Sequence, residues 1–157
     1  MFQFKELIQT GMESASNVEQ NRKSVNDVFS SLNEELKKET QGLIIIERYN
    51  KQKNVLVDII NTYTMVTQGS EPVLEINKNP DSGTLKIVLK NGLNASVARW
   101  EQHPDGYPFT IEFLGERIDC WDQEALVNAL GKIVVSGQLW LKVKELSSQT
   151  PPEPELS

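Results

Sequence analysis

The chain has almost none of the two residues that most often build catalytic and metal centres. It contains one histidine, His103, and one cysteine, Cys120, in 157 residues. One cysteine excludes a disulfide within the chain and is typical of a reducing compartment, so we expect a cytoplasmic protein. One histidine excludes a metal site built on a histidine pair. We expect His103 to be a solvated turn residue and Cys120 to be a small core residue rather than a nucleophile.

Sequence motifs for chemistry are also missing. The chain contains no glycine-rich phosphate loop, no G-x-S-x-G, no H-E-x-x-H and no C-x-x-C. No apolar run is long enough for a bilayer, and the N-terminus lacks a signal-peptide profile. The net charge of −6 argues against nonspecific nucleic-acid binding, which needs clustered lysine and arginine. We therefore expect no cofactor, no membrane association and no direct nucleic-acid binding.

What the chain does have is a concentrated negative charge. Between residues 101 and 124 there is one base, Arg117, and there are seven acids: Glu101, Asp105, Glu112, Glu116, Asp119, Asp122 and Glu124. This stretch carries the whole net charge of −6, because the remaining residues contain 15 acids and 15 bases. Such a concentration favours association with a basic partner through long-range attraction.

The most regular pattern lies in residues 107–134, which predict a hairpin followed by a helix. Apolar and polar residues alternate over Phe109–Phe113, the period of a half-buried strand. Gly115-Glu116 suits a two-residue type II′ turn. Asp122 is expected to cap a helix. The apolar stripe of that helix would be Leu126, Val127, Leu130, Ile133 and Val134.

The predicted turn fixes a strand register. On the inner face it pairs Phe113 with Ile118. On the outer face it places Glu112 directly opposite Asp119. Like charges in that position destabilise a sheet by roughly 0.2–1 kcal/mol, so stability alone does not explain this predicted pair.

Residues 4–39 predict one long helix, or two in line. A first apolar stripe consists of Phe4, Leu7, Ile8 and Met12. A second stripe, close to heptad spacing, consists of Val18, Val25, Val28, Phe29, Leu32 and Leu36. Gly11 weakens the join, so a break or a frayed first turn is expected near it. The helix either packs against a sheet or forms a seam for self-association or for a partner.

The rest of the chain mainly predicts strands. They are expected at 43–48, 55–64, 73–77, 84–89 and 95–100, and residues 139–143 are expected to be a short strand or the close of the domain; helix stays an alternative for 53–67. The proline-rich tail 147–157 is expected to be disordered.

The fold class is therefore α+β, with a long N-terminal helix, an antiparallel β-meander of five to seven strands, and a C-terminal amphipathic helix packed on one sheet face. Residues 1–146 form one domain, with a helical segment at 1–41 and the sheet plus helix at 43–143.

The candidate binding residues are the acids and aromatic residues around the hairpin: Glu101, Asp105, Tyr107, Glu112, Glu116, Asp119 and Trp121. Trp100 is a further aromatic of the kind that anchors interfaces. Three interpretations of this surface stay open. It is a solvated strand face, a docking surface for a basic partner, or a carboxylate site for a divalent metal, although the spacing matches no known metal-binding loop.

These observations favour a small intracellular macromolecule-binding protein over an enzyme. Inhibitor, immunity or adaptor roles fit a compact acidic protein that uses a sheet face, the N-terminal helix or both. The alternative is a carboxylate- or metal-dependent hydrolase that uses Glu112 and Asp119, with Glu101 or Asp105. We assign no catalytic residue and no metal ligand.

Overall fold

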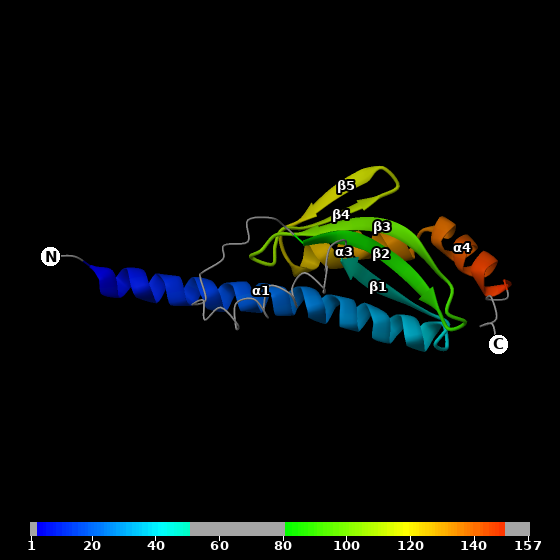
Figure 1. Ribbon diagram of the computed structural model, residues 1–157, viewed down its shortest axis with the longest axis horizontal. Helices are drawn as coiled ribbons and strands as arrows, with labels where there is room; N and C mark the ends of the chain where they lie inside the picture. Colours follow the sequence, from blue (N-terminus) through cyan, green and yellow to red (C-terminus); the bar gives the residue numbers. More distant parts are fainter. Residues whose placement is uncertain (1–2, 51–80, 150–157) are drawn as a thin grey trace, which may run out of the picture.

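The computed structural model describes residues 3–50 and 81–149 and confirms the α+β class (Figure 1). Five antiparallel strands follow in chain order: β1 (Ile44–Asn50), β2 (Asp81–Leu89), β3 (Asn94–Gln102), β4 (Phe109–Phe113) and β5 (Glu116–Cys120). The helices within these described residues are α1 (Phe4–Glu39), α3 (Gln123–Val134) and α4 (Gly137–Ser147). The segments expected at 55–64 and 73–77, the choice of conformation for 53–67, and the tail from 150 onward lie outside the described residues.

One hydrophobic core lies between the helices and the inner face of the sheet. The strands contribute alternate residues, as a half-buried sheet requires. The strand residues of the core include Ile44, Ile46, Leu85, Ile87, Ala98, Trp100, Phe109, Ile111 and Cys120. The helices add Val25, Phe29, Leu126, Ile133, Leu139 and Val143, among others. The predicted N-cap of α3 is confirmed, because the Asp122 side chain accepts a hydrogen bond from the backbone N–H of Ala125 at 2.8 Å.

Helix α1 is continuous over 36 residues, so the break predicted near Gly11 is wrong. A single glycine costs about 1 kcal/mol in a helix, which lowers stability without interrupting the hydrogen bonds on either side. Among the described residues, the buried side chains of α1 all lie in its second half and are Val25, Val28, Phe29 and Leu36. None of the helices described has both the length and the apolar content needed to cross a bilayer.

The closing strand predicted at 139–143 is wrong, because these residues belong to α4. The buried residues of α4 are Leu139, Val143 and Leu146, whose spacing of four and three follows the helical period. A five-residue window is too short to show that period, so its β-branched and apolar content was misleading.

The register of the β4–β5 hairpin also differs from the prediction. The loop consists of Leu114 and Gly115, with φ of 49° and 79°, one residue earlier than predicted. Ile118 therefore lies opposite Ile111 rather than Phe113. The observed and the predicted pairings differ by two residues, so the same side chains lie on the inner face in both registers. Leucine seldom adopts positive φ, which is why the sequence favoured the wrong turn.

The turn at 103–106 joins the sheet to the middle of α1. The Arg22 guanidinium donates to the carbonyl oxygen of Pro104 at 3.0 Å, and the Asn21 amide donates to that of Asp105 at 3.2 Å. Gly106 closes the turn with φ of 97°, where a Cβ atom would lie 2.6 Å from Cβ of Asn21. This glycine is therefore needed for both its conformation and its contact.

Gly106→Ala should lower the free energy of unfolding by roughly 2–3 kcal/mol, because it adds backbone strain and a collision with α1. Gly92→Ala is the matched control. Gly92 has φ of 90°, but a Cβ there meets nothing within 4 Å, so only the strain of about 1 kcal/mol is expected. Urea denaturation measures both losses. Equal losses would show that the turn does not press against α1.

Candidate functional site

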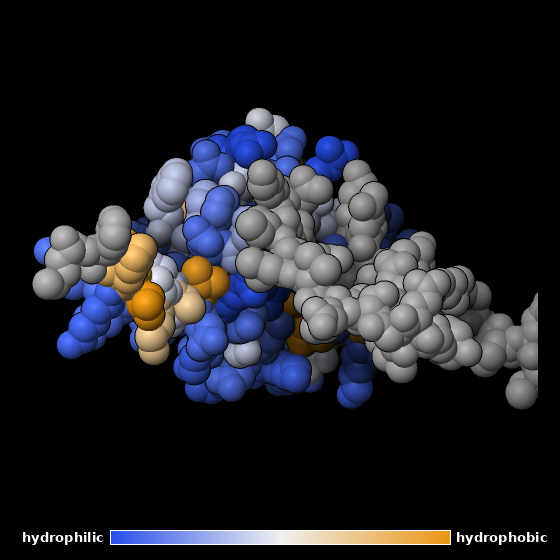
Figure 2. All heavy atoms as spheres, turned by 60° about the vertical axis from the view of Figure 1, so that its left-hand side comes forward, coloured by the Kyte–Doolittle hydropathy of each residue, from blue (hydrophilic) through white to orange (hydrophobic). Residues whose placement is uncertain are grey.

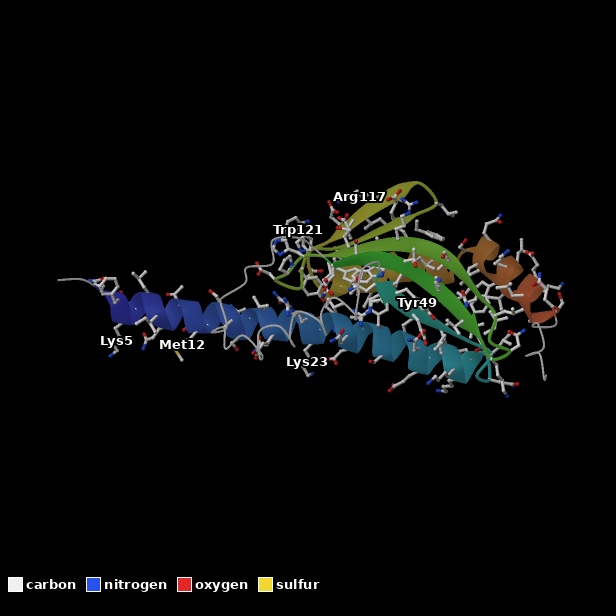
Figure 3. All side chains as sticks on the ribbon, viewed as in Figure 1. Lys5, Met12, Lys23, Tyr49, Arg117 and Trp121 are labelled. Atoms are coloured by element: carbon white, nitrogen blue, oxygen red, sulfur yellow. The ribbon has the colours of Figure 1, made fainter. Side chains whose placement is uncertain are left out.

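The outer face of the sheet lies on the side away from α1, where Arg117 projects (Figure 3), and carries three of the seven predicted site residues: Glu101, Glu112 and Asp119. On β3, β4 and β5 its residues are Arg99, Glu101, Thr110, Glu112, Arg117 and Asp119. They form two rows across the strands. Arg99, Glu112 and Arg117 make one row, and Glu101, Thr110 and Asp119 make the next.

The like-charge pair predicted between Glu112 and Asp119 does not exist. Glu112 lies opposite Arg117, and Asp119 lies opposite Thr110. The Thr110 hydroxyl donates to the Asp119 carboxylate at 2.8 Å. The cost attributed to this pair is absent, so it no longer argues for a binding role.

Arginines balance part of the acidity of the outer face. Arg117 lies 3.5 Å from the Glu101 carboxylate and 3.6 Å from that of Asp119, in pairs that are half exposed and therefore weak. Arg99 stands beside Glu112 on the neighbouring strand. A shallow cleft of about 380 Å³ opens above these residues, with Ser82 and Thr84 of β2 at its other side. The surface is polar and carries charges of both signs.

The remaining acids of the 101–124 stretch lie elsewhere. Glu116 contacts Lys132 of α3 at 3.2 Å, which takes it away from the outer face. Asp122 caps α3, and Glu124 lies in its first turn, where negative charge interacts favourably with the helix dipole. Asp105 belongs to the turn against α1. The concentration of charge in the sequence is thus spread over several places in the fold.

The aromatic residues divide in the same way. Trp100 is 5% exposed and stacks on Phe109 with ring centroids 5.6 Å apart, so it belongs to the core and cannot anchor a partner. The hydroxyl of Tyr107 is hydrogen-bonded to that of Ser24 on α1 at 2.8 Å. Trp121 is 70% exposed at the end of β5 and is the aromatic residue of the predicted set that a partner could reach (Figure 3).

The single cysteine and the single histidine have different surroundings. Cys120 is fully buried, and burial, with added repulsion from Asp119 and Asp122, raises the pKa of its thiol to about 11. A thiol with that pKa is almost entirely protonated at neutral pH and is a poor nucleophile. Nδ1 of His103 accepts a hydrogen bond from the backbone N–H of Asp105 at 3.0 Å. Within residues 3–50 and 81–149, no group of three or more His, Cys, Asp or Glu could hold a metal ion.

The clearest unexplained surface is the first part of α1, residues 4–18, which we call the arm. It extends beyond the sheet (Figure 1), and every residue from 3 to 17 is exposed. The arm carries four large apolar side chains with exposed fractions of 61–69%: Phe4, Leu7, Ile8 and Met12. Figure 2 shows apolar atoms gathered at the end where α1 begins.

Sequence reasoning identified the apolar stripe of the arm but assigned it to packing or to a seam without deciding between them. The second half of α1 packs against the fold. For the arm, the sequence alone does not show what covers the apolar stripe. No protein-family model, curated protein or solved structure matches this chain.

Proposed function

We propose that the protein is an interaction protein that binds another protein chain, with the arm as its main docking surface. The single observation that carries this proposal is the exposure of four large apolar residues on one side of a helix that extends beyond its own fold. Contiguous exposed apolar surface of this kind marks interaction sites. Inhibitor, immunity and adaptor roles all use such surfaces.

The energetics of the arm support the proposal. A helix of about 15 residues is marginal in water without tertiary packing. The arm keeps its apolar side chains in solvent, so docking into a groove would gain hydrophobic free energy and stabilise the helix as well. Residues at spacings of three and four, such as Phe4, Leu7 and Ile8, are the pattern by which amphipathic helices fill grooves.

The outer face is proposed as a second, weaker surface for a partner with basic groups. It offers three exposed or half-exposed carboxylates, those of Glu101, Glu112 and Asp119, against the two arginines Arg99 and Arg117. With charges of both signs, it would add specificity and speed of association more than affinity.

Two variants test these surfaces. Tagged wild-type protein should capture a protein from its source cells that Ile8→Asp fails to capture. Glu112→Gln with Asp119→Asn should still capture it but associate more slowly, with the difference largest at low salt. Capture of the same proteins by wild type and Ile8→Asp would contradict the role of the arm. Equal association rates for wild type and the double variant at every salt concentration would show that the outer face has no role in binding.

A further inference from the structure

We infer that the partner of the arm is a second copy of this chain, and that two arms pair side by side in opposite directions. This inference rests on the proposed function, because it names the occupant of the same surface. It is carried by three features: the register of the apolar seam, the large residues Phe4 and Ile8 followed by the small residues Gly11 and Ala15 along it, and the point where the arm meets the folded body.

The arm carries a coiled-coil seam that continues into the part of α1 packed against its own fold. Phe4, Ile8, Gly11, Ala15 and Val18 follow the alternating spacing of four and three that defines positions a and d. The same spacing continues without a shift through Arg22, Val25, Phe29, Leu32 and Leu36. In that second part Arg22 is still exposed, whereas the seam from Val25 to Leu36 packs against the sheet and α3. The exposed part of the seam is thus built like the buried part.

Large and small residues of the arm fit each other when two copies run in opposite directions. With the two-fold axis between Gln9 and Thr10, layers of a against d place Phe4 opposite Ala15 and Ile8 opposite Gly11. A Cβ atom on Gly11 would meet nothing within 4 Å in this chain, so the fold itself gives no steric reason for a glycine there. The side chain of Ile8 from a second copy would fill that space.

The flanks of the seam agree with the same register. Lys5, Met12 and Glu19 occupy equivalent positions beside the seam, and Lys5 and Met12 project from the same edge of the arm (Figure 3). Side chains lean toward the helix N-terminus, so in the antiparallel pair Met12 reaches Met12 across the axis. Lys5 reaches Glu19 of the other copy in the same way, which gives two ion pairs of opposite charge.

Two other arrangements conflict with the folded body. A parallel partner that followed the seam further would reach residues 25–36, where this fold already covers the seam. An antiparallel pair shifted by one heptad toward the folded body would press Phe4 against Arg22, which is hydrogen-bonded to the carbonyl oxygen of Pro104. In the proposed register Phe4 lies opposite Ala15, so the contact ends before the turn at 103–106. The free length of the arm and the length of the contact therefore match.

The contact is small, with about ten residues from each copy against the 20–30 of a standard interface. The dimer should therefore be weak, with a dissociation constant on the order of micromolar. Sedimentation equilibrium of the full chain from about 5 to 500 μM should show a reversible monomer–dimer equilibrium. A monomer throughout this range would overturn the inference.

Charge exchange tests the direction of the arms. Lys5→Glu and Glu19→Lys should each weaken the dimer several-fold, because each change creates two like-charge pairs. The double variant should recover the wild-type dissociation constant, and an equimolar mixture of the two single variants should form a heterodimer in preference to either homodimer. A dimer that neither single change weakens, or that the double change fails to restore, would contradict the antiparallel register.

Ile8→Asp separates this inference from the proposed function. It should weaken the dimer at least tenfold, since it places a carboxylate against Gly11 in the centre of the contact. Wild-type protein could be monomeric and still capture another protein, with capture lost in Ile8→Asp. That result would support the proposed function and show that the partner is not a second copy. A monomeric wild type that Ile8→Asp destabilises would show that the seam is covered within one chain, and both proposals would fall.

Discussion

Replacing Phe109 with alanine should lower the free energy of unfolding by about 3–5 kcal/mol. Phe109 has no exposed surface and lies at the centre of the aromatic cluster of the core. Its ring stacks on Trp100 with an interplanar angle of 7°, and it meets Phe29 of α1 at 56°, with centroid distances of 5.6 Å in both contacts. The substitution therefore removes a contact between the sheet and α1 and leaves a cavity that these neighbours cannot easily fill.

Phe113 is the matched control for this prediction. It lies on the same strand and the same face as Phe109, but it is only partly buried at the end of the hairpin. Phe113→Ala should therefore cost roughly 1–2 kcal/mol. Chemical denaturation of both variants measures the difference. A larger loss for Phe113 than for Phe109 would mean that the centre of the core lies nearer the hairpin loop.

The sequence predicted the faces of the hairpin correctly and its register wrongly, and both outcomes have the same physical cause. The side chains of a strand alternate with a period of two, so the sequence shows which residues face inward. A displacement by two residues leaves every face unchanged, so the alignment of Phe113, Ile111 and Ile118 fits either register. Only the turn decides between them, and here it uses Leu114 at positive φ, which composition does not suggest.

The candidate site depended on that register, which is why it changed most. A two-residue error turned the Glu112–Arg117 neighbours into an apparent pair of acids. The burial of Trp100, by contrast, could have been predicted. Ala98 and Trp100 alternate with Arg99 and Glu101 along β3, so the strand period alone places the tryptophan on the inner face.

The case of α1 shows a different limit. Its heptad spacing is visible in the sequence over the whole length, but spacing reveals a face and not what covers that face. Whether Val18 or Val25 is buried depends on where the sheet ends, and that is a property of the assembled fold. The two halves of one seam therefore have opposite environments: the arm is exposed and the second half is buried.

Val25→Asp should destabilise the protein by at least about 4 kcal/mol, because it buries a carboxyl group at a position with no exposed surface and with apolar neighbours. Ile8→Asp is the matched control at another seam position of the same helix. Ile8 is 61% exposed, so its change should alter the free energy of unfolding by less than about 0.5 kcal/mol at protein concentrations where the chain is monomeric. Both substitutions put aspartate into a helix interior in place of a β-branched residue, so differences in helix propensity nearly cancel.

Thermal and urea denaturation well below micromolar protein concentration, where the chain is monomeric, measure the two variants. Should Val25→Asp leave the protein stable, α1 would not be part of the core and its contacts with the sheet would be misplaced. The Ile8 result has its own meaning, because a stable Ile8→Asp monomer shows that the arm is not needed for folding. An apolar side chain that folding does not require, kept in solvent on an exposed helix, is then explained by what the arm binds.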